Sequence, residues 1–540
     1  MSAAAGRADR WDAIVVGSGF GGAMAAHALV HAGHRVLMLE RGGWVARGPQ
    51  NWRQSGMGLL GPHYSTETPY EVSVGGRRRR VGAWHCVGGQ SVFYGGASFR
   101  FREREFAHDD AIVGDSGAAW PFGYDALEPF YARAERLLGV AGLAGADPTE
   151  PWRSEPYPQR PAPLSAPSQV VSDAARRLGL APFPIPLAIS YAADGGRRAC
   201  IRCGTCDGYA CAAEAKNDLA TGVIPALVRL GMTLRPNTVC VRVTRAGRRV
   251  TGVEWVDRVT GERGHLAARV VVLAAGTLAT PHLLLASGMD QLSSAPGALG
   301  RYLTRHRNAV VLGLFPRRPN PEGAFDKQVA IHDFYDGAPD DPRAPEGPLG
   351  GIQMMTPPQG LVRAYLPRLV RDPGAALVSY ATGLLAIAED QPRRENGVEL
   401  GAARDRFGMP LLRVRHAYSR RDGLAAAALV RQARRVLREA GAPLALVHSI
   451  ETFTHALGTA RMGPDPREAP LDGHGAFRGV DGLFVADGSA LPRSGGVNPS
   501  LTIAAVALMV GEHAAAALPP AAALVRALPS RRPLPTLETT

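Results

Sequence analysis

Short apolar runs near the start of the chain predict two buried strands with a helix between them. Residues 12–16 (Asp-Ala-Ile-Val-Val) and 35–39 (Arg-Val-Leu-Met-Leu) have the length and composition of strands that are buried on both faces. The intervening residues 20–32 are rich in Ala and are followed by Gly33, which is typical of a helix and its end. Together these segments predict a βαβ unit.

Similar patterns return far along the chain. Some segments alternate apolar and polar residues, whereas others are uninterrupted apolar runs. The predicted elements are an antiparallel hairpin over 238–256 that turns near Ala246–Gly247, a buried strand over 269–274, a helix over 281–287, a buried strand over 483–486 and an apolar helix over 500–517. Because the buried strands are alike but widely separated, they predict one nucleotide-binding sheet assembled from discontinuous segments.

Other regions carry weaker patterns. Residues 45–80 lack a clear period and are interpreted as a loop or lid, and the Pro-rich stretches 146–168 and 181–188 are expected to interrupt regular structure. Residues 307–450 are uneven in character, carry no readable motif and are expected to form a second domain. The predicted fold class is α/β with α+β character: a Rossmann-like domain assembled from discontinuous segments, plus a second domain with an antiparallel sheet.

The composition is that of a globular protein with more than one core. The chain has 540 residues, of which 46% are hydrophobic and 20% charged, and this length favours two intimately joined domains. The formal net charge is +13, but the only dense run of arginines, Arg77–Arg80, is interpreted as a solvated loop. No aromatic residues interleave with that run as base-stacking platforms would, so no nucleic-acid partner is expected.

The sequence also bears on location. No apolar stretch reaches the roughly 18 residues of a membrane span, and the N-terminus lacks the charged-then-apolar pattern of a signal peptide. A cytoplasmic protein is expected. In that compartment the six cysteines need not form disulfides, and Cys86 and Cys240 are interpreted as ordinary buried residues.

A Gly-rich turn follows the first predicted strand. Gly17-Ser18-Gly19-Phe20-Gly21-Gly22 fits the pattern G-x-G-x-x-G. Its first glycine permits a tight turn, its second lets the backbone approach a pyrophosphate, and its third lets helix and strand pack closely. Glu40 ends the next strand and can accept hydrogen bonds from ribose hydroxyls. These features predict a dinucleotide site but do not separate FAD from NAD.

Four stretches of the sequence together point to one enzyme family. They are the βαβ opening; Val87-Gly-Gly-Gln-Ser-Val-Phe-Tyr-Gly-Gly96; Leu273-Ala-Ala-Gly-Thr277 with Pro281 and Leu283–Leu285; and a C-terminal set of His455-Ala-Leu-Gly-Thr-Ala-Arg-Met-Gly463, Val485-Ala-Asp-Gly-Ser489 and Asn498-Pro-Ser-Leu-Thr-Ile503. In these motifs the chain resembles the glucose–methanol–choline (GMC) flavoprotein oxidoreductases. The resemblance implies that FAD is the cofactor.

The resemblance also implies which residues contact the cofactor. Members that tether FAD covalently have a His where this chain has Phe93, so non-covalent FAD is expected. Asp487 would lie near the pyrophosphate–ribitol region, with a helix N-cap as its structural alternative, and Val241 or Val243 near adenine. The expected FAD contacts are Gly17, Gly19, Phe20, Gly22, Glu40, Arg41, Gly88, Gly89, Ser91, Val241, Ala275, Gly276, Asp487, Gly488, Asn498, Pro499 and Ser500.

Alcohol oxidation needs a base for the hydroxyl proton while a hydride leaves the carbon for flavin N5. The resemblance implies His455 as this base, since a neutral imidazole suits the role near neutral pH, and Asn498 as the residue that orients the substrate oxygen. A structural histidine is the alternative, and the nearby His448 is a competing candidate that lies outside the motif.

The expected function is FAD-dependent oxidation of an alcohol to a carbonyl compound, with O₂ or another electron acceptor. The motif around His455 is closest to the sugar and polyol dehydrogenase branch of the family. A sugar, glycoside or polyol hydroxyl is therefore expected, including one on an aminoglycoside-like natural product. The alternatives are a hydroxynitrile lyase that keeps FAD without net redox, and a sterol-type alcohol oxidase.

A cysteine-rich segment leaves three interpretations open. Cys200, Cys203, Cys206 and Cys211 follow C-x₂-C-x₂-C-x₄-C, whose first three positions match the start of a ferredoxin-type run. The last spacing is longer by one residue, and structural zinc sites usually have two separated pairs. A packed loop or a redox-made disulfide is favoured over an iron–sulfur cluster, and zinc is the third interpretation, so no metal is expected.

The resemblance suggests how the chain divides between two domains. The FAD-binding parts are 8–125, with the flavin loop at 85–98; 200–306, with the cysteine-rich loop at 200–211; and 451–517, with the catalytic motifs. The substrate domain comprises 126–199 and 307–450, and 518–540 form a flexible tail.

Overall fold

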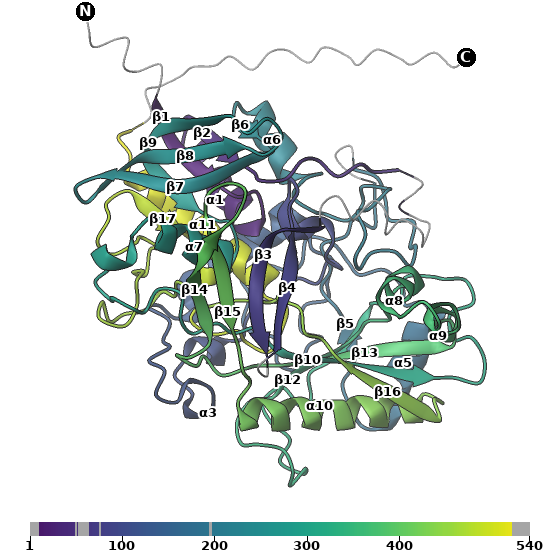
Figure 1. Ribbon diagram of the computed structural model, residues 1–540. Coiled ribbons are helices and arrows are strands. Elements are labelled where there is room, and N and C mark those ends of the chain that lie inside the picture. Colours follow the sequence, from purple (N-terminus) through teal and green to yellow (C-terminus); the bar gives the residue numbers. More distant parts are fainter. Residues whose placement is uncertain (1–9, 49–50, 52–63, 75–76, 194–196, 521–540) are drawn as a thin grey trace, which may run out of the picture.

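The computed structural model describes residues 10–48, 51, 64–74, 77–193 and 197–520 (Figure 1). Of the tail predicted over 518–540, residues 521–540 lie outside the described residues, as do parts of the segment interpreted as a lid. In Figure 1 a nucleotide-binding type of sheet lies at the top and a second large sheet at the bottom. Of the described residues, none belongs to a helix that is both long and apolar enough to cross a membrane.

The predicted βαβ opening is confirmed as β1 (Arg10–Val16), α1 (Phe20–His31) and β2 (Val36–Leu39). The two strands pair in parallel, with Ala13 opposite Val36. On its other side β1 pairs in parallel with β9 (Arg263–Leu273). The end of β9 pairs in parallel with β17 (Leu483–Val485). The separated buried strands therefore meet in one sheet, as predicted.

This sheet has seven strands and is extended at both edges. The order is β6-β2-β1-β9-β8-β7, with β17 also paired to β9. The added strands are β6 (Thr233–Arg235), β7 (Thr238–Ala246) and β8 (Arg249–Asp257). The hairpin of β7 and β8 confirms the predicted antiparallel turn near Gly247.

Two apolar helices pack together on this sheet. The helix predicted at the C-terminal end is α11 (Ser500–Ala516), and it contacts α1 along its length. Gly511 allows the close approach, because a Cβ there would lie 2.8 Å from the Cα of Ala25. Both helices are apolar on nearly all sides and are largely buried, as expected of helices inside a large core.

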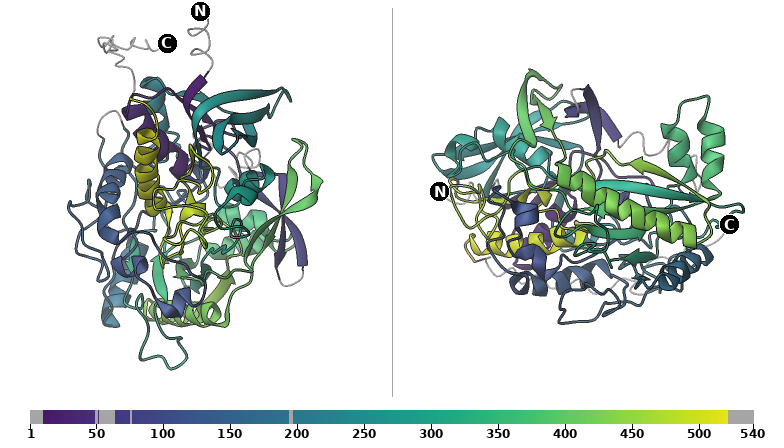
Figure 2. Two further views of the ribbon diagram at one scale, coloured as in Figure 1. Left: turned by 90° about the vertical axis from the view of Figure 1, so that its left-hand side faces the viewer. Right: turned by 90° about the horizontal axis from the view of Figure 1, so that it is seen from below.

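A second sheet of six strands forms the other large layer, in the order β16-β10-β13-β12-β11-β5. Its strands are β5 (Phe183–Pro184), β10 (Arg307–Leu314), β11 (Val329–Ile331), β12 (Gly350–Met354), β13 (Ala381–Ala388) and β16 (Leu444–Ser449). All its pairings are antiparallel. The long helix α10 (Arg420–Glu439) covers one face, as both views from the front and from below show (Figures 1 and 2).

A third sheet corrects the interpretation of residues 45–80. The described part of that segment forms β3 (Tyr64–Val74), which pairs with β4 (Arg77–Trp84), so Arg77–Arg80 belong to a strand and not to a loop. The hairpin is completed by β14 (Gly397–Arg404) and β15 (Pro410–Arg415), of which β15 pairs in parallel with β3. The pairing of β3 with β4 is local, but on its other edge β3 is joined by β15, which lies more than 300 residues further along the chain.

The remaining elements connect and cover the sheets. The α-helices are α3 (Asp110–Val113), α4 (Tyr124–Leu138), α5 (Ala166–Arg177), α6 (Val223–Arg229), α7 (Ala279–Ala286), α8 (Gln359–Tyr365) and α9 (Arg371–Val378), and short 3-10 helices occur at Gly89–Val92, Glu103–Phe106, Asp290–Leu292 and Gly488–Ala490. The Pro-rich stretch 146–168 ends in the first turn of α5, where Pro167 is tolerated because the first helical N–H groups need no intrahelical partner.

Candidate active site

The turn between β1 and α1 requires glycine at two positions for steric reasons. Gly17 has φ +100°, and a Cβ on it would lie 2.2 Å from the carbonyl oxygen of Ala274. A Cβ on Gly22 would lie 1.9 Å from the carbonyl oxygen of Gly17. The first and third motif glycines therefore hold the strand, the turn and the neighbouring segment together.

Gly19 differs from these two. A Cβ on Gly19 would meet no atom within 4 Å, so the space beside its backbone is open. Gly89 packs against it, since a Cβ on Gly89 would lie 3.1 Å from the Cα of Gly19. Ser18 joins the same two loops, because its hydroxyl oxygen accepts from the Gly88 N–H at 2.9 Å and donates to Glu40 Oε2 at 2.6 Å. The flavin loop of the sequence motif thus lies directly on the dinucleotide turn.

Two buried carboxylates support these loops. Glu40 accepts from the N–H groups of Ser18 at 3.1 Å and of Gly42 at 2.8 Å. Burial raises the pKa of Glu40 above its usual value, and these hydrogen bonds oppose part of that rise. Asp487 accepts from the Ser489 N–H at 2.9 Å, which is the N-cap arrangement, and from the Gly276 N–H at 2.8 Å. Asp487 therefore ties the C-terminal motif to the segment that follows β9.

A cavity of about 330 Å³ lies between the dinucleotide turn, the flavin loop and the end of β9. Among the residues expected to contact the cofactor, those that line it are Gly17, Gly19, Phe20, Glu40, Arg41, Gly89, Ala275, Gly276, Asp487 and Gly488. Those that do not line it are Gly22, Gly88, Ser91, Val241, Asn498, Pro499 and Ser500. The structure therefore gathers the expected residues from four separate segments at one cavity.

Two of the residues that do not line the cavity, Ser91 and Ser500, donate hydrogen bonds to backbone carbonyl oxygens nearby. Ser91 is buried and donates to the Gly88 carbonyl oxygen at 2.6 Å, so it shapes the flavin loop. Ser500 donates to the carbonyl oxygen of Ala97 at 2.9 Å at the start of α11. On β7 the wall is formed by Thr238, Val239 and Cys240 instead of Val241 or Val243.

Cys240 corrects one interpretation and Cys86 confirms another. Cys240 is only half-buried and lines the cavity, whereas Cys86 is fully buried. Sequence reasoning also missed other lining residues, namely Tyr70, Trp84, His85, Met409 and Phe453. They come from the third sheet and its neighbours, and no motif marks them because that sheet was not predicted.

The two residues expected to carry the chemistry meet beside this cavity. His455 Nε2 lies 3.3 Å from Asn498 Nδ2, and the neighbours of His455 in the chain, Thr454 and Ala456, line the cavity. Burial lowers the pKa of the His455 imidazole well below its usual value, and His306 and Lys327 act in the same direction. A neutral imidazole is therefore favoured at this position.

Asn498 is buried, with 9% of its surface exposed. Its Oδ1 atom has no hydrogen-bond partner among the described residues. An amide with one buried, unsatisfied acceptor is suited to receive a donor from a bound molecule. In contrast, the competing candidate His448 lies exposed on the edge strand β16, paired with Val310.

A third histidine, His306, was not predicted as a site residue. Its Nδ1 lies 3.0 Å from Nδ1 of His455, and the two rings are nearly perpendicular with centroids 5.1 Å apart. It directly precedes β10, and no spacing in the sequence links it to His455.

The cysteine-rich loop is packed beneath the flavin loop. Lys216 is buried and donates to the carbonyl oxygens of Tyr94 at 2.8 Å, Cys206 at 2.9 Å and Tyr209 at 2.8 Å. The six cysteines are all free thiols in this structure. Within the part of the chain that the structure describes, no three His, Cys, Asp or Glu side chains are grouped to hold a metal ion. The side-chain positions thus lend no support to a cluster on Cys200, Cys203, Cys206 and Cys211.

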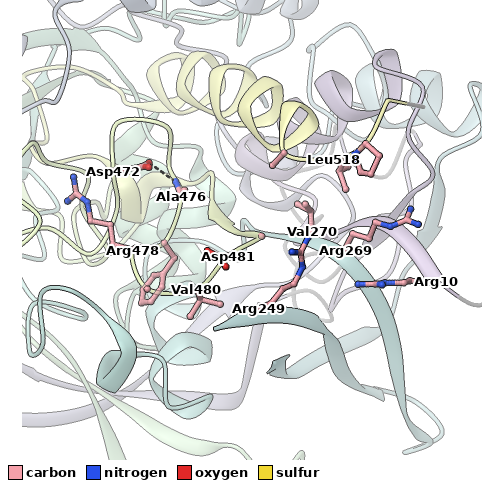
Figure 3. Close-up of a pocket in the computed structure, with 15 residues that line it drawn as sticks. Arg10, Arg249, Arg269, Val270, Asp472, Ala476, Arg478, Val480, Asp481 and Leu518 are labelled. Carbon is pink, nitrogen blue, oxygen red and sulfur yellow. Dashed lines mark hydrogen bonds between the residues drawn. The ribbon is translucent and has the colours of Figure 1, made fainter. Parts of the chain in front are cut away.

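A second cavity, of about 590 Å³, lies near the starts of β1 and β8 (Figure 3). Arginines line much of it, but Arg269 is paired with Asp12 at 2.5 Å and Arg478 donates to the Ala469 carbonyl oxygen at 2.8 Å. None of the expected site residues lines this cavity.

Comparison with known proteins identifies the family. Two family models, both described as GMC oxidoreductase, match the chain over residues 11–308 and 392–507, the first of which spans more than half of it. The chain belongs to the GMC oxidoreductase family. The resemblance seen in the motifs is thereby confirmed, and with it an FAD-dependent enzyme that oxidises an alcohol hydroxyl.

Several characterised relatives cover nearly the whole chain. The 6'''-hydroxyparomomycin C oxidase of Streptomyces lividus is 32% identical, over 93% of this chain and 91% of the relative. The paromamine 6'-oxidase of Streptomyces fradiae is 30% identical, over 92% and 90%. The 2-methyl-1,2-propanediol dehydrogenase of Mycolicibacterium austroafricanum is 27% identical, over 94% and 95%.

The fold is also shared with solved structures. The crystal structure of pyridoxine 4-oxidase from Mesorbium loti aligns with a TM-score of 0.65 at 20% identity and covers 93% of this chain and 99% of that one. The predicted mixed α/β fold with a Rossmann-like FAD-binding sheet is confirmed.

The cavity fits this cofactor. The open space beside Gly19 adjoins the N-terminus of α1, where backbone N–H groups favour a pyrophosphate. Arg41 lines the same cavity, and its Nη2 atom is buried without a hydrogen-bond partner among the described residues. A buried, unsatisfied guanidinium nitrogen is suited to an electron-rich group of a bound nucleotide.

Proposed function

We propose that this enzyme oxidises a hydroxyl of an aminoglycoside-like sugar, with His455 as the base and Asn498 as the residue that orients the substrate oxygen. The observation that carries the assignment is the approach of His455 Nε2 to Asn498 Nδ2, at 3.3 Å, beside the cofactor cavity. These two polar groups come from different motifs and converge on one place.

The chemistry follows from the protonation state of His455. FAD, when bound, supplies an acceptor for the hydride that leaves the alcohol carbon. The neutral His455 imidazole accepts the hydroxyl proton at Nε2, and its low pKa keeps it neutral near pH 7. Asn498 donates from Nδ2 to the substrate oxygen, an interaction that suits both the alcohol and the carbonyl product.

The cofactor contacts form a second part of the proposal. Gly17, Gly19, Glu40 and Asp487 would hold the nucleotide and pyrophosphate portions, since all four line the cavity. Non-covalent FAD is proposed because Phe93 occupies the tethering position, where it packs against Trp84 with ring centroids 4.4 Å apart. The division into FAD-binding and substrate domains and the cytoplasmic location also remain predictions.

The substrate class rests on the relatives. Two of them are named for oxidising hydroxyparomomycin and paromamine, and both are matched over almost their whole length. Because these relatives are named oxidases, O₂ is proposed as the electron acceptor. Another relative is named a dehydrogenase, so a different acceptor is the alternative that the experiment must separate.

The test is an anaerobic titration of the FAD-bound protein. Paromamine and 2-methyl-1,2-propanediol would be added separately while the flavin absorbance is recorded. Bleaching by paromamine at a concentration at least about tenfold lower than by the diol, one factor of ten being about 1.4 kcal/mol, supports the proposed substrate class. Oxygen is then admitted, and rapid return of the flavin absorbance supports O₂ as acceptor.

A matched variant ties the activity to the proposed base. His455→Asn keeps a polar side chain of smaller size and should leave bound flavin that paromamine no longer bleaches. Bleaching at an unchanged rate in this variant would rule out His455 as the base. A wild-type flavin that no alcohol reduces would instead overturn the proposed activity.

A further inference from the structure

The neighbours of the His306 ring determine which of its nitrogens carries a hydrogen. Its Nε2 lies 3.0 Å from the carbonyl oxygen of Ser494 and 2.9 Å from that of Gly495. Carbonyl oxygens only accept hydrogen bonds, so His306 Nε2 must carry a hydrogen. In the neutral ring the lone pair is then on Nδ1.

That lone pair faces the proposed base. His306 Nδ1 lies 3.0 Å from Nδ1 of His455, and one of the two atoms must donate. Because His306 Nδ1 is the acceptor, His455 Nδ1 carries the hydrogen, and the lone pair of the neutral His455 ring is on Nε2. The Nε2 atom is the one that approaches Asn498.

We propose that His306 is a positioning residue that holds His455 in the Nδ1–H tautomer, so that Nε2 carries the lone pair that accepts the substrate proton. The inference rests on the proposed function and deepens it by naming the atom that acts and the residue that selects it. After proton transfer, His455 Nδ1–H still donates to His306, so the arrangement accommodates both protonation states of the base.

The backbone of His306 is held in an uncommon conformation. Its φ is +59°, a left-handed value that few residues other than glycine adopt. Its N–H donates to Asp390 Oδ1 at 2.9 Å, and its carbonyl oxygen accepts from the Tyr418 hydroxyl at 2.8 Å. Since such a conformation persists only where neighbours enforce it, these two hydrogen bonds hold the backbone that places the ring.

Asp390 accepts hydrogen bonds both from His306 and from the segment that contacts its ring. Its Oδ1 also accepts from the Ser494 hydroxyl at 2.9 Å, so one carboxylate fixes the backbone of His306 and the segment whose carbonyl groups select its tautomer. Asp390 is 1% exposed. Burial alone would raise its pKa, but His416 and His306 lower it, so the carboxylate is charged and its hydrogen bonds are strong.

The opposite tautomer of His306 is unfavourable here. It would direct the Nε2 lone pair at two carbonyl oxygens about 3 Å away, in a buried place where unsatisfied acceptors are costly. A doubly protonated His306 would turn His455 Nδ1 into an acceptor and put the hydrogen on His455 Nε2. That state could not accept the substrate proton at Nε2, so it is the outcome that the experiment must exclude.

The first test needs no substrate. The FAD-bound protein would be labelled with ¹⁵N in its histidines, and the ring shifts of His455 would be assigned from the spectrum of His455→Asn. Protonated and unprotonated ring nitrogens have well-separated ¹⁵N shifts. A protonated Nδ1 with an unprotonated Nε2 supports the inference, whereas a protonated Nε2 in the neutral ring overturns it.

Two variants at position 306 separate tautomer control from a general structural effect. His306→Leu removes the acceptor, so we expect a mixture of His455 tautomers. The limiting rate of flavin reduction by paromamine should be about 100-fold lower, whereas the paromamine concentration that gives half of that rate should be unchanged. His306→Asn can place an amide oxygen near the position of Nδ1, and we expect a rate within about tenfold of wild type and a restored Nδ1–H signal.

A matched control lies on the other side of Asp390. His416 is buried, its Nε2 lies 3.5 Å from Asp390 Oδ2, and no contact joins it to His455 among the described hydrogen bonds. His416→Asn should therefore leave the tautomer of His455 unchanged. If His306→Leu retains both the wild-type tautomer and the wild-type rate, the inference is wrong. If no alcohol reduces the flavin of the wild-type enzyme, the proposed function fails, while the ¹⁵N spectrum still decides the tautomer of His455.

Discussion

The cofactor turn and the catalytic corner of this enzyme are built by different kinds of interaction. The cofactor turn is Gly17–Gly22, where missing side chains let backbone segments approach to distances that a Cβ would forbid. The catalytic corner comprises His306, Asp390, His455 and Ser494–Asn498, where buried and half-buried side chains hold one another through directed hydrogen bonds.

Because of this difference, the two regions respond differently to amino-acid substitution. Steric exclusion at the turn acts at single positions, because one methyl group on Gly17 or Gly22 would overlap a backbone oxygen. The catalytic corner depends on charge and hydrogen bonding between segments far apart in the chain. Glu389, adjacent to Asp390, adds to this network, because it forms a two-pronged ion pair with Arg493 at 3.0 Å for each contact and accepts from the Gly495 N–H at 3.1 Å.

The largest effect is expected at the turn itself. Gly17→Ala places a Cβ 2.2 Å from a backbone oxygen at φ +100°, which we expect to lower the free energy of unfolding by on the order of 3 kcal/mol and to abolish FAD binding. Gly19→Ala has room in the protein, so the apoprotein should unfold at nearly the same temperature while FAD affinity falls at least about tenfold. Thermal unfolding and FAD titration measure both.

This pair of variants tests whether Gly17 and Gly19 have different roles. If Gly19→Ala destabilises the apoprotein as much as Gly17→Ala does, then the turn is not divided into a packing glycine and a ligand-facing glycine. Equal FAD affinity of Gly19→Ala and wild type would show that the open space beside Gly19 is not occupied by the cofactor.

In the catalytic corner, His455→Asn should reduce the limiting rate of flavin reduction by about 1,000-fold. FAD affinity and unfolding temperature should change little, because His455 contacts His306 and Asn498 and not the turn. Stopped-flow absorbance gives the rate and calorimetry the stability. A matching loss of FAD would show that the two regions are not separable in this way.

The ion pair beside the catalytic corner should affect stability more than chemistry. Glu389→Gln leaves the buried Arg493 guanidinium without its carboxylate partner, and we expect a loss of about 3 kcal/mol in the free energy of unfolding. Adding Arg493→Met should recover part of it, because no buried charge then remains unpaired. Urea unfolding of the single and double variants measures this, and additive losses would contradict a direct pairing.

The smallest expected effect is the response to pH. Because the pKa of His455 is held well below its usual value near 6.5, the base is neutral above that lowered pKa, and flavin reduction should stay constant from about pH 8 to about pH 6. The rate should fall only when protonation begins at lower pH. A decline already centred near pH 6.5 would show an ordinary imidazole.

The same shift has a consequence for stability. Unfolded His455 takes up a proton near pH 6.5, whereas the folded form resists it. Stability therefore decreases as the pH falls through that range. This decrease should be smaller in His455→Asn, which sharpens the assignment to this group.

Features that act within a short stretch of chain could be predicted. Residues 12–39 carry their own strand, helix and strand pattern, and the spacing of the glycines in the turn marks the motif without knowledge of the segments that pack on it. His455 and Asn498 lie inside family motifs, which is why they could be named in advance.

Features that depend on distant partners could not be predicted. The strands β3 and β4 come from a segment without a clear alternation, and the sheet that they form is completed by β14 and β15 from far along the chain. His306 carries no motif signal, since its contact with His455 joins positions 149 residues apart. The motif predicts that Ser91 contacts the cofactor, and only the structure shows that its buried hydroxyl donates to the Gly88 carbonyl oxygen within the flavin loop.

The sequence by itself determined the Rossmann-like opening, the family and the two residues proposed to act on the substrate. It could do so because local hydrophobic periodicity and contiguous motifs are properties of neighbouring residues. Only the tertiary structure decided the tautomer of His455. That property depends on His306, Asp390 and two carbonyl groups brought together from separate segments. The direction of a hydrogen bond is a matter of geometry in space, which the order of residues along the chain does not contain.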